Sequence, residues 1–219
     1  MFDLSPYDAI VFDLDGVIVS TDEQHYLAWK MIADDEGIPY SREINNRQRG
    51  VSRMESLDVL LEAAPKAYSQ AEKNEMAFRK NEEYKRGISF LKPGDMLEGM
   101  PEILALLKEK GLKSAIASSS KNTNTILERL ELSNWFDAVV SGSDIKASKP
   151  DPEVFSLAAQ WLGLDPAKCL CVEDAKAGIE SGRGAGMKTL GIGPSTRGIS
   201  DFHFEETRDF ALALGISLS

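Results

Sequence analysis

The chain is poor in the residues that build sulfur and nitrogen metal clusters. Its 219 residues include two cysteines, Cys169 and Cys171, and two histidines, His25 and His203. The cysteines lie two apart in one apolar run, where a disulfide between them would have poor geometry. A zinc site would need further sulfur or nitrogen ligands beside them. We therefore expect two buried, reduced thiols without a chemical role.

Basic residues are fewer than acidic ones. The chain carries 25 lysines and arginines against 35 aspartates and glutamates, a formal net charge of −10. Nucleic-acid-binding surfaces are usually basic patches, so this balance argues against a nucleic-acid partner. A site for an anionic substrate must draw on local cations, because the overall field of the protein repels anions.

No apolar run in the sequence is long enough to cross a membrane. The first residues, 1–6, lack the basic start and the apolar stretch of a signal peptide. We therefore expect a cytoplasmic protein without a membrane partner. The length suits one substantial core, or a core with a smaller domain.

Short apolar runs typical of buried strands recur along the chain and, in its second half, alternate with segments of helical periodicity. The expected strands are 9–12, 113–117, 138–140, 169–172 and 189–192, and the expected helices are 101–110, 122–130, 152–162 and 175–185. Three glycines, Gly178, Gly182 and Gly184, weaken the prediction of the last helix. This alternation predicts an α/β fold, with a Rossmann-like, doubly wound parallel sheet and helices on both faces.

Residues 21–89 break the alternation. About seventy residues with helical patterning and high charge are too many for a plain crossover between strands. We interpret 21–89 as a small helical cap domain inserted into a catalytic core of residues 1–20 and 90–219, with a return hinge near 92–94. An insertion at this point would lie over the carboxyl ends of the strands, where open α/β sheets bind ligands.

The first predicted strand ends in two carboxylates, Asp13 and Asp15, followed by Gly16. Side chains two apart on an extended strand project from the same side. Two adjacent carboxylates repel each other unless a cation or a shared proton relieves them. The pattern is typical of a carboxylate nucleophile beside a hard metal ion, with a second carboxylate for proton transfer. Taken alone, the motif could equally be a polar turn.

Three other strand ends carry polar groups. Ser118 opens a Ser-Ser-Ser-Lys-Asn segment suited to a phosphate, although serines before a helix are often only caps. Lys149 follows the third strand, and we expect a cis bond between it and Pro150 because cis bonds are largely confined to positions before proline. Glu173 and Asp174 form a second acidic strand end, as an oxygen-ligated magnesium site requires.

In this order and at these strand ends, the four motifs resemble those of the haloacid dehalogenase superfamily of phosphotransferases, over nearly the full chain. The dehalogenases themselves lack the second acid, present here as Asp15. The inserted segment and the strand ends look like those of the β-phosphoglucomutase family. The matching segments are 13–18, Thr21, His25, 28–30, 49–53, 117–122, 147–150 and 173–174.

The resemblance implies roles for the polar residues at the strand ends. Asp13 would be the phosphorylated nucleophile and Asp15 the general acid and base. Ser118 and Lys149 would hold oxygens of the transferring phosphate. The implied ligands of Mg²⁺ are Asp13, the Asp15 carbonyl, Glu173 and Asp174.

The resemblance also implies a substrate-binding set. Arg53 of the cap would grip the phosphate that is not transferring, and the remaining residues would line that phosphate, the sugar or the hinge. They are His25, Trp29, Gly50, Val51, Ser52, Ser120, Lys121 and Asn122. For Trp29 the alternative is a place in the core of the cap, and for His25 a surface position. Ser20 departs from the family, in which this position is often acidic.

The predicted function is a magnesium-dependent phosphomutase. It would interconvert β-D-glucose 1-phosphate and glucose 6-phosphate through an aspartyl-phosphate enzyme and a sugar bisphosphate. The partners would be a small sugar phosphate and glucose 1,6-bisphosphate as activator, and we expect a monomer. A sugar-phosphate phosphatase on the same scaffold is the alternative, and a non-catalytic sugar-phosphate sensor is a third class.

Overall fold

The computed structural model describes residues 1–218, and its centre is a parallel sheet. Among these residues the sheet has six strands in the order β3-β2-β1-β4-β5-β6, and each neighbouring pair runs parallel. The strands are β1 (Ala9–Phe12), β2 (Lys113–Ala117), β3 (Ala138–Val140), β4 (Cys169–Glu173), β5 (Lys188–Ile192) and β6 (Phe202–Phe204). The predicted doubly wound α/β fold is confirmed, and β6 is a strand that the sequence analysis did not find.

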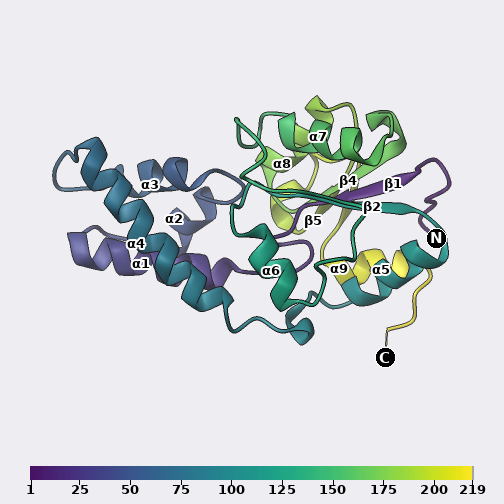
Figure 1. Ribbon diagram of the computed structural model, residues 1–219, viewed down its shortest axis with the longest axis horizontal. Helices are drawn as coiled ribbons and strands as arrows, with labels where there is room; N and C mark the ends of the chain where they lie inside the picture. Colours follow the sequence, from purple (N-terminus) through teal and green to yellow (C-terminus); the bar gives the residue numbers. More distant parts are fainter. Residues whose placement is uncertain (219) are drawn as a thin grey trace.

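Helices cover both faces of the sheet, because successive side chains of each strand alternate between two hydrophobic clusters (Figure 1). In β1, Ile10 and Phe12 face one cluster, and Ala9 and Val11 face the other. On the first face lie α5 (Met100–Glu109), α6 (Thr123–Arg129) and α9 (Thr207–Ala213); on the second lie α7 (Glu153–Leu162) and α8 (Lys176–Gly184). Short 3₁₀ turns are η1 (Pro93–Asp95), η2 (Pro166–Lys168) and η3 (Pro194–Thr196).

The glycines of α8 are required by close packing on β4. A Cβ on Gly178 would lie 1.8 Å from Glu173 Oε1, and one on Gly182 would lie 2.5 Å from Cys171 Sγ. The helix therefore forms despite its low intrinsic propensity, because tertiary contact overrides that propensity. Cys169 and Cys171 are free and buried, as expected.

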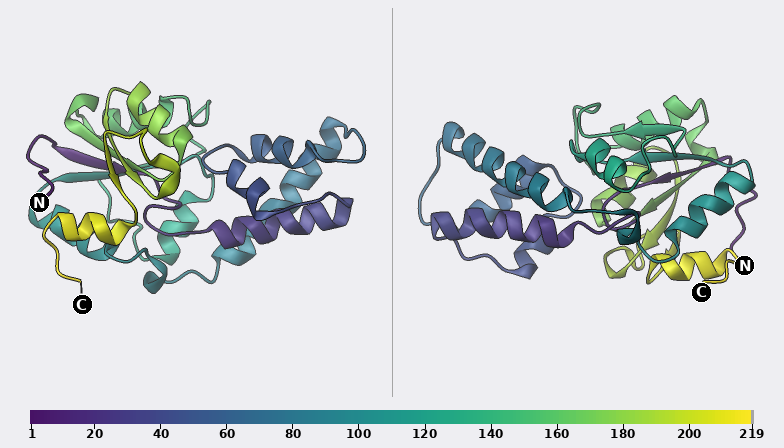
Figure 2. Two further views of the ribbon diagram at one scale, coloured as in Figure 1. Left: turned by 180° about the vertical axis from the view of Figure 1, so that it is seen from behind. Right: turned by 60° about the horizontal axis from the view of Figure 1, so that its bottom comes forward.

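Four further helices lie to one side of the sheet, between β1 and α5 in the chain (Figures 1 and 2). They are α1 (Asp22–Glu36), α2 (Arg42–Arg47), α3 (Arg53–Leu61) and α4 (Gln70–Ile88). Three of them, α1, α3 and α4, share a hydrophobic cluster of their own, which contains Trp29, Ile32, Leu57 and Met76. We propose residues 21–89 as the cap, and 1–20 with 90–219 as the core; residue 219 lies outside the described part.

The two connections between these helices and the sheet run side by side. Val19 forms a bridge with Asp15 in the outgoing segment and an antiparallel bridge with Met96 in the returning one. Elsewhere in the core the Lys149–Pro150 peptide is cis, so that prediction is confirmed. None of the helices in residues 1–218 combines the length and apolar character needed to span a bilayer.

Candidate active site

The ends of β1 and β4 bring three ionic side chains together. Phe12 pairs with Val172 across these neighbouring strands, so Asp13 emerges beside Glu173. Lys149 Nζ donates to Asp13 Oδ1 at 2.5 Å and to Glu173 Oε1 at 2.7 Å. All three residues are buried. Segments 136 residues apart in the chain therefore meet at one edge of the sheet, as the strand-end argument predicted.

The ammonium of Lys149 and the carboxylates of Asp13 and Glu173 stabilise one another in their charged forms. Burial alone would lower the pKa of Lys149, but the carboxylates of Asp13 and Glu173 outweigh that effect and raise it. The amine is therefore a permanent cation next to Asp13. Burial raises the pKa of Glu173, and the nearby Lys149 ammonium opposes that rise. A buried charge is tolerated here because it is paired and hydrogen-bonded.

Asp174 adds a third carboxylate, which has no lysine paired with it among residues 1–218. Carboxylate oxygens of Asp13, Glu173 and Asp174 lie within 4.8 Å of one another. Burial raises the pKa of Asp174 well above its usual range, and the charges of Glu173 and Asp13 raise it further. Gly16, at φ +92°, makes room for this side chain, since a Cβ there would lie 2.3 Å from Asp174 Oδ2. Three crowded oxygen donors fit a hard divalent cation such as Mg²⁺.

The Asp15 side chain is held apart from that cluster by the first residue of the cap. Thr21 donates its N–H to Asp15 Oδ1 at 2.7 Å and its hydroxyl to Oδ2 at 2.6 Å. The Thr21 hydroxyl accepts in turn from the Tyr84 hydroxyl at 2.9 Å. Burial raises the pKa of Asp15, and the two Thr21 hydrogen bonds oppose that rise. The family resemblance implies that Asp15 contacts the metal through its main-chain carbonyl. Its carboxylate therefore remains available for proton transfer.

Two side chains of the cap, the half-buried His25 and the buried Lys80, face Asp15 from the other side. His25 Nε2 lies 3.6 Å from Asp15 Oδ2, and His25 Nδ1 lies 2.8 Å from Lys80 Nζ. Burial, followed by the charge of Arg53, lowers the pKa of Lys80 to about 7. Burial and the neighbouring Lys80 and Arg53 also lower the pKa of His25 well below its usual range. These shifts favour a neutral imidazole at His25, and a Lys80 ammonium that donates to Nδ1 would leave the Nε2–H on the side of Asp15.

The predicted phosphate seat follows β2. Ser118 is buried, and its Oγ accepts from the Ser120 N–H at 3.2 Å. Ser120 Oγ accepts from the Asn122 N–H at 3.1 Å, and the Asn122 amide donates to Asn81 of α4, also at 3.1 Å. The side chain of Lys121 is exposed at the rim. This loop therefore presents hydroxyl, amide and ammonium donors to the cavity and touches the cap.

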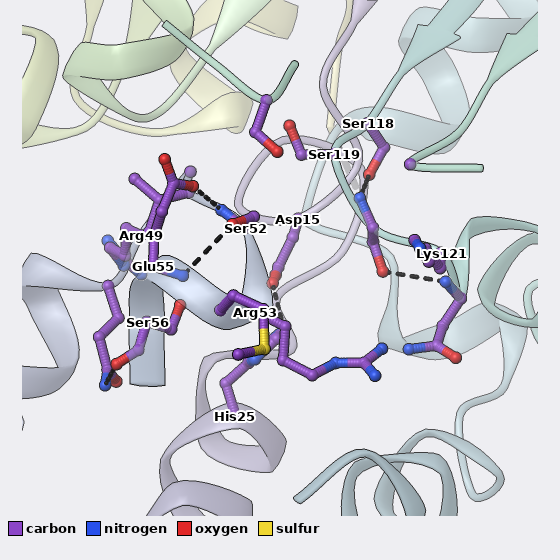
Figure 3. Close-up of a pocket in the computed structure, with 18 of the residues that line it drawn as sticks. Asp15, His25, Arg49, Ser52, Arg53, Glu55, Ser56, Ser118, Ser119 and Lys121 are labelled. Carbon is purple, nitrogen blue, oxygen red and sulfur yellow. Dashed lines mark hydrogen bonds and ion pairs between the residues drawn. The ribbon is translucent and has the colours of Figure 1, made fainter. Parts of the chain in front are cut away.

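The cap contributes the loop before α3. Ser52 caps α3 and forms a capping box with Glu55, whose carboxylate accepts from the Ser52 N–H at 2.7 Å. Gly50, at φ +76°, packs against the loop after β4, since a Cβ there would lie 3.2 Å from the Ala175 Cβ. Arg53 is half-buried and extends across the cavity toward the side that carries Lys121 (Figure 3). Partial burial lowers the pKa of the Arg53 guanidinium.

These side chains line one cavity of about 840 Å³ between the cap helices and the sheet. Every residue predicted for the site lines it except Glu173, which lies behind Lys149. Trp29 is 1% exposed and belongs to the hydrophobic cluster of the cap, in line with the alternative that we gave for it. Lining residues that the sequence analysis did not single out for the site include Asp22, Gln48, Arg49, Lys80, Asn81 and Tyr84.

Comparison with known proteins finds two β-phosphoglucomutases and a phosphatase among the proteins that this chain resembles. A β-phosphoglucomutase of Bacillus subtilis (strain 168) is 43% identical over 209 residues, which cover 94% of this chain and 92% of that protein. A crystal structure of a β-phosphoglucomutase from Clostridium difficile superposes with a TM-score of 0.87 at 35% identity and covers 93% of this chain and 92% of that one. A phosphorylated carbohydrates phosphatase of Thermotoga maritima is 34% identical over 185 residues, covering 84% and 83% of the two chains.

The family comparison spans most of the chain. Residues 10–192 match the family described as haloacid dehalogenase-like hydrolase, and this range contains all the residues predicted for the site. The resemblance to that superfamily in the sequence is therefore confirmed. The chain is an enzyme that belongs to the haloacid dehalogenase-like hydrolase family.

Proposed function

We propose that this enzyme is a magnesium-dependent mutase that interconverts β-D-glucose 1-phosphate and glucose 6-phosphate. The observation that carries the proposal is the pairing, within one cavity, of a carboxylate–lysine cluster at Asp13 with a separate anion-binding group at Arg53. A mutase needs both, because its substrate carries one phosphate that reacts and, as a bisphosphate, one that does not. The similarity to two β-phosphoglucomutases supports this choice of substrate.

Asp13, Glu173 and Asp174 are the carboxylates that would hold Mg²⁺, together with the Asp15 carbonyl. When bound, the ion neutralises negative charge on the transferring phosphoryl group. The Lys149 ammonium, fixed by Asp13 and Glu173, supplies a second positive charge to the same oxygens. The Ser118 hydroxyl would donate to the remaining oxygen.

The proposed reaction has two transfers. An oxygen of Asp13 attacks phosphorus, a new P–O bond forms, and the bond between phosphorus and the sugar oxygen breaks. Asp15 gives its proton to the departing sugar oxygen; in the reverse transfer it takes a proton from the hydroxyl that attacks. The raised pKa of Asp15 favours the protonated form, which is the form that gives a proton to the sugar oxygen.

Between the transfers the sugar bisphosphate must turn round in the cavity. The same groups must then hold either phosphate while the other reacts. A planar guanidinium can do this with paired hydrogen bonds, and we assign that role to Arg53, with Ser120, Lys121 and Asn122 opposite. Closure of the cap would keep water from the aspartyl phosphate.

The second candidate is a sugar-phosphate phosphatase, which differs by letting water attack the aspartyl phosphate. The 34% identity to a phosphorylated carbohydrates phosphatase favours it. One assay separates the two: the enzyme receives β-glucose 1-phosphate, Mg²⁺ and catalytic glucose 1,6-bisphosphate, and glucose 6-phosphate is measured against free phosphate. Excess glucose 6-phosphate supports the mutase, and stoichiometric free phosphate contradicts it. We also propose a cytoplasmic monomer with glucose 1,6-bisphosphate as activator.

A further inference from the structure

Arg49, in the loop between α2 and α3, connects the cap to a carboxylate of the core. Its Nη1 lies 3.7 Å from Asp174 Oδ2. The same guanidinium donates from Nε to Asp22 Oδ1 at 3.1 Å and forms an ion pair with Asp22 through Nη2. Asp22 is the first residue of α1. One cation is therefore shared between a carboxylate of the cap and a carboxylate of the proposed metal site.

The Arg49–Asp174 pair also separates two cavities. Both residues line the main cavity, and both line a second cavity of about 330 Å³ on the other side. The second cavity is also lined by Glu98, which pairs with Arg208, and by Glu206. The Arg49 side chain, 31% exposed, thus has space on that side if it leaves Asp174.

The charge around Asp174 explains why Arg49 lies there. Asp174 stands beside the carboxylates of Asp13 and Glu173, and Lys149 contacts only the latter two. A positive charge close to Asp174 relieves repulsion among the three carboxylates. A divalent cation would meet the same need, and two cations on one carboxylate repel each other.

We propose that Arg49 competes with the divalent metal for Asp174, so that binding of the metal loosens the attachment of the cap loop to the core. The inference rests on the proposed function for the assignment of Asp13, Glu173 and Asp174 as metal ligands. Gly50, the next residue, packs on Ala175, so the pair fixes this loop where it meets the core. Arg49 is thereby a positioning residue that links metal binding to the cap.

The test measures Mg²⁺ binding directly, by titration calorimetry on the whole chain without sugar phosphate. Arg49→Gln should lower the dissociation constant for Mg²⁺ roughly three- to tenfold, the range expected for removal of one nearby, partly screened charge. The matched control is Arg42→Gln, which removes the same charge from a cap arginine that pairs with Glu23 instead. The control should bind Mg²⁺ like the wild type. Equal affinity in Arg49→Gln and wild type, with both folded by circular dichroism, would overturn the proposal.

A double-mutant cycle separates competition from a general field effect. Asp22→Asn frees the guanidinium for Asp174, so it should weaken Mg²⁺ binding in the wild-type background. In the Arg49→Gln background the same change should have almost no effect. An equal loss in both backgrounds would mean that Asp22 acts only as a nearby negative charge, and the competition would be refuted.

The experiments distinguish failure of the Arg49 inference from failure of the proposed mutase function. If the wild type makes glucose 6-phosphate but the cycle shows no coupling, the inference fails and the mutase assignment stands. If the cycle shows coupling but the wild type releases only free phosphate, the mutase assignment fails and the role of Arg49 stands.

Discussion

Lys80 Nζ lies 2.8 Å from His25 Nδ1, and both side chains belong to the cap although the pair faces Asp15 of the core. Lys80 is 2% exposed and has no carboxylate hydrogen-bonded to it among the described residues. Arg53 adds a like charge, while the more distant Asp15 favours the ammonium form. Cap and core are thus joined electrostatically at the group proposed for proton transfer.

Lys80 should make the stability of the protein depend on pH. Its pKa is about 7 in the folded protein and lies near the usual 10.5 when unfolded, so between these values the unfolded chain binds more protons. Stability should therefore rise from pH 7 to pH 9, by up to about 1 to 2 kcal/mol from this group. Urea unfolding at the two pH values measures the rise. It should shrink in Lys80→Met and persist in Lys85→Met, an exposed lysine on the same helix.

Asp13→Asn should abolish turnover, because the amide cannot form an acyl phosphate. The fold should survive, since an amide replaces a carboxylate of the same shape. Mutase assays on the purified variant, with circular dichroism as a check on folding, test this expectation. Appreciable residual activity would remove Asp13 from the nucleophile role.

Asp15→Asn should allow phosphate binding and slow transfer to and from the sugar hydroxyl by about a hundredfold or more, as expected for loss of a general acid and base. The asparagine Oδ1 can still accept the Thr21 N–H, and its NH2 can donate to the Thr21 hydroxyl, so the local backbone should be retained. Single-turnover kinetics with the sugar phosphate measure the effect. A rate near that of the wild type would make Asp15 a structural residue.

Arg53→Ala should weaken binding of both sugar phosphates and raise the share of turnovers that end in free phosphate. The anchor for the distal phosphate is lost, and the cap would then exclude water less well. Phosphorylation of Asp13 by acetyl phosphate should be spared, because that donor has no distal phosphate. Arg47→Ala is the matched control, since Arg47 is an exposed cap arginine paired with Glu62. An unchanged ratio of glucose 6-phosphate to free phosphate in Arg53→Ala would favour the phosphatase alternative.

Gly16→Ala should lower stability by about 1 to 3 kcal/mol and weaken Mg²⁺ binding. The position has φ +92°, and the new Cβ would lie 2.3 Å from Asp174 Oδ2, so the carboxylate must move. Thermal unfolding and calorimetric Mg²⁺ titration measure the two effects. Gly94→Ala is the control, because a Cβ at Gly94 meets no atom within 4 Å. Equal Mg²⁺ affinity in Gly16→Ala would show that Asp174 is not held in place by this close contact.

The strand-end residues could be placed from the sequence, because an apolar run that ends in carboxylates indicates both a buried strand and reactive or metal-binding groups at its end. Asp13, Lys149, Glu173 and Asp174 meet as that argument predicted. The register of a parallel sheet fixes such residues at one edge, whatever lies between them in the chain.

Lys80 and Tyr84 could not be assigned in the same way. They lie in α4, a helix with many charges, where a lysine is usually solvated; only the packing of α4 on α1 brings them beside His25 and Thr21. The strand β6 and the helix α9 were missed, although β3 and α6 are equally short and were predicted; β6 has the sequence Phe-His-Phe and lacks the continuous apolar run, Ala-Val-Val, that identified β3. These apolar residues were left unassigned from the sequence alone. The structure shows that the rings of Phe204 and Phe210 pack against Phe2.

The Val19–Met96 bridge brings the two ends of the inserted segment together. Antiparallel bridge partners have Cα atoms only about 5 Å apart, so a short turn could join the two segments after removal of everything between them. Such a turn would leave the register of the six described strands unchanged, because each of them lies before Val19 or after Met96 in the chain. Insertion at this point costs the core little loop-closure entropy, and one sheet can therefore carry lids of very different size and chemistry.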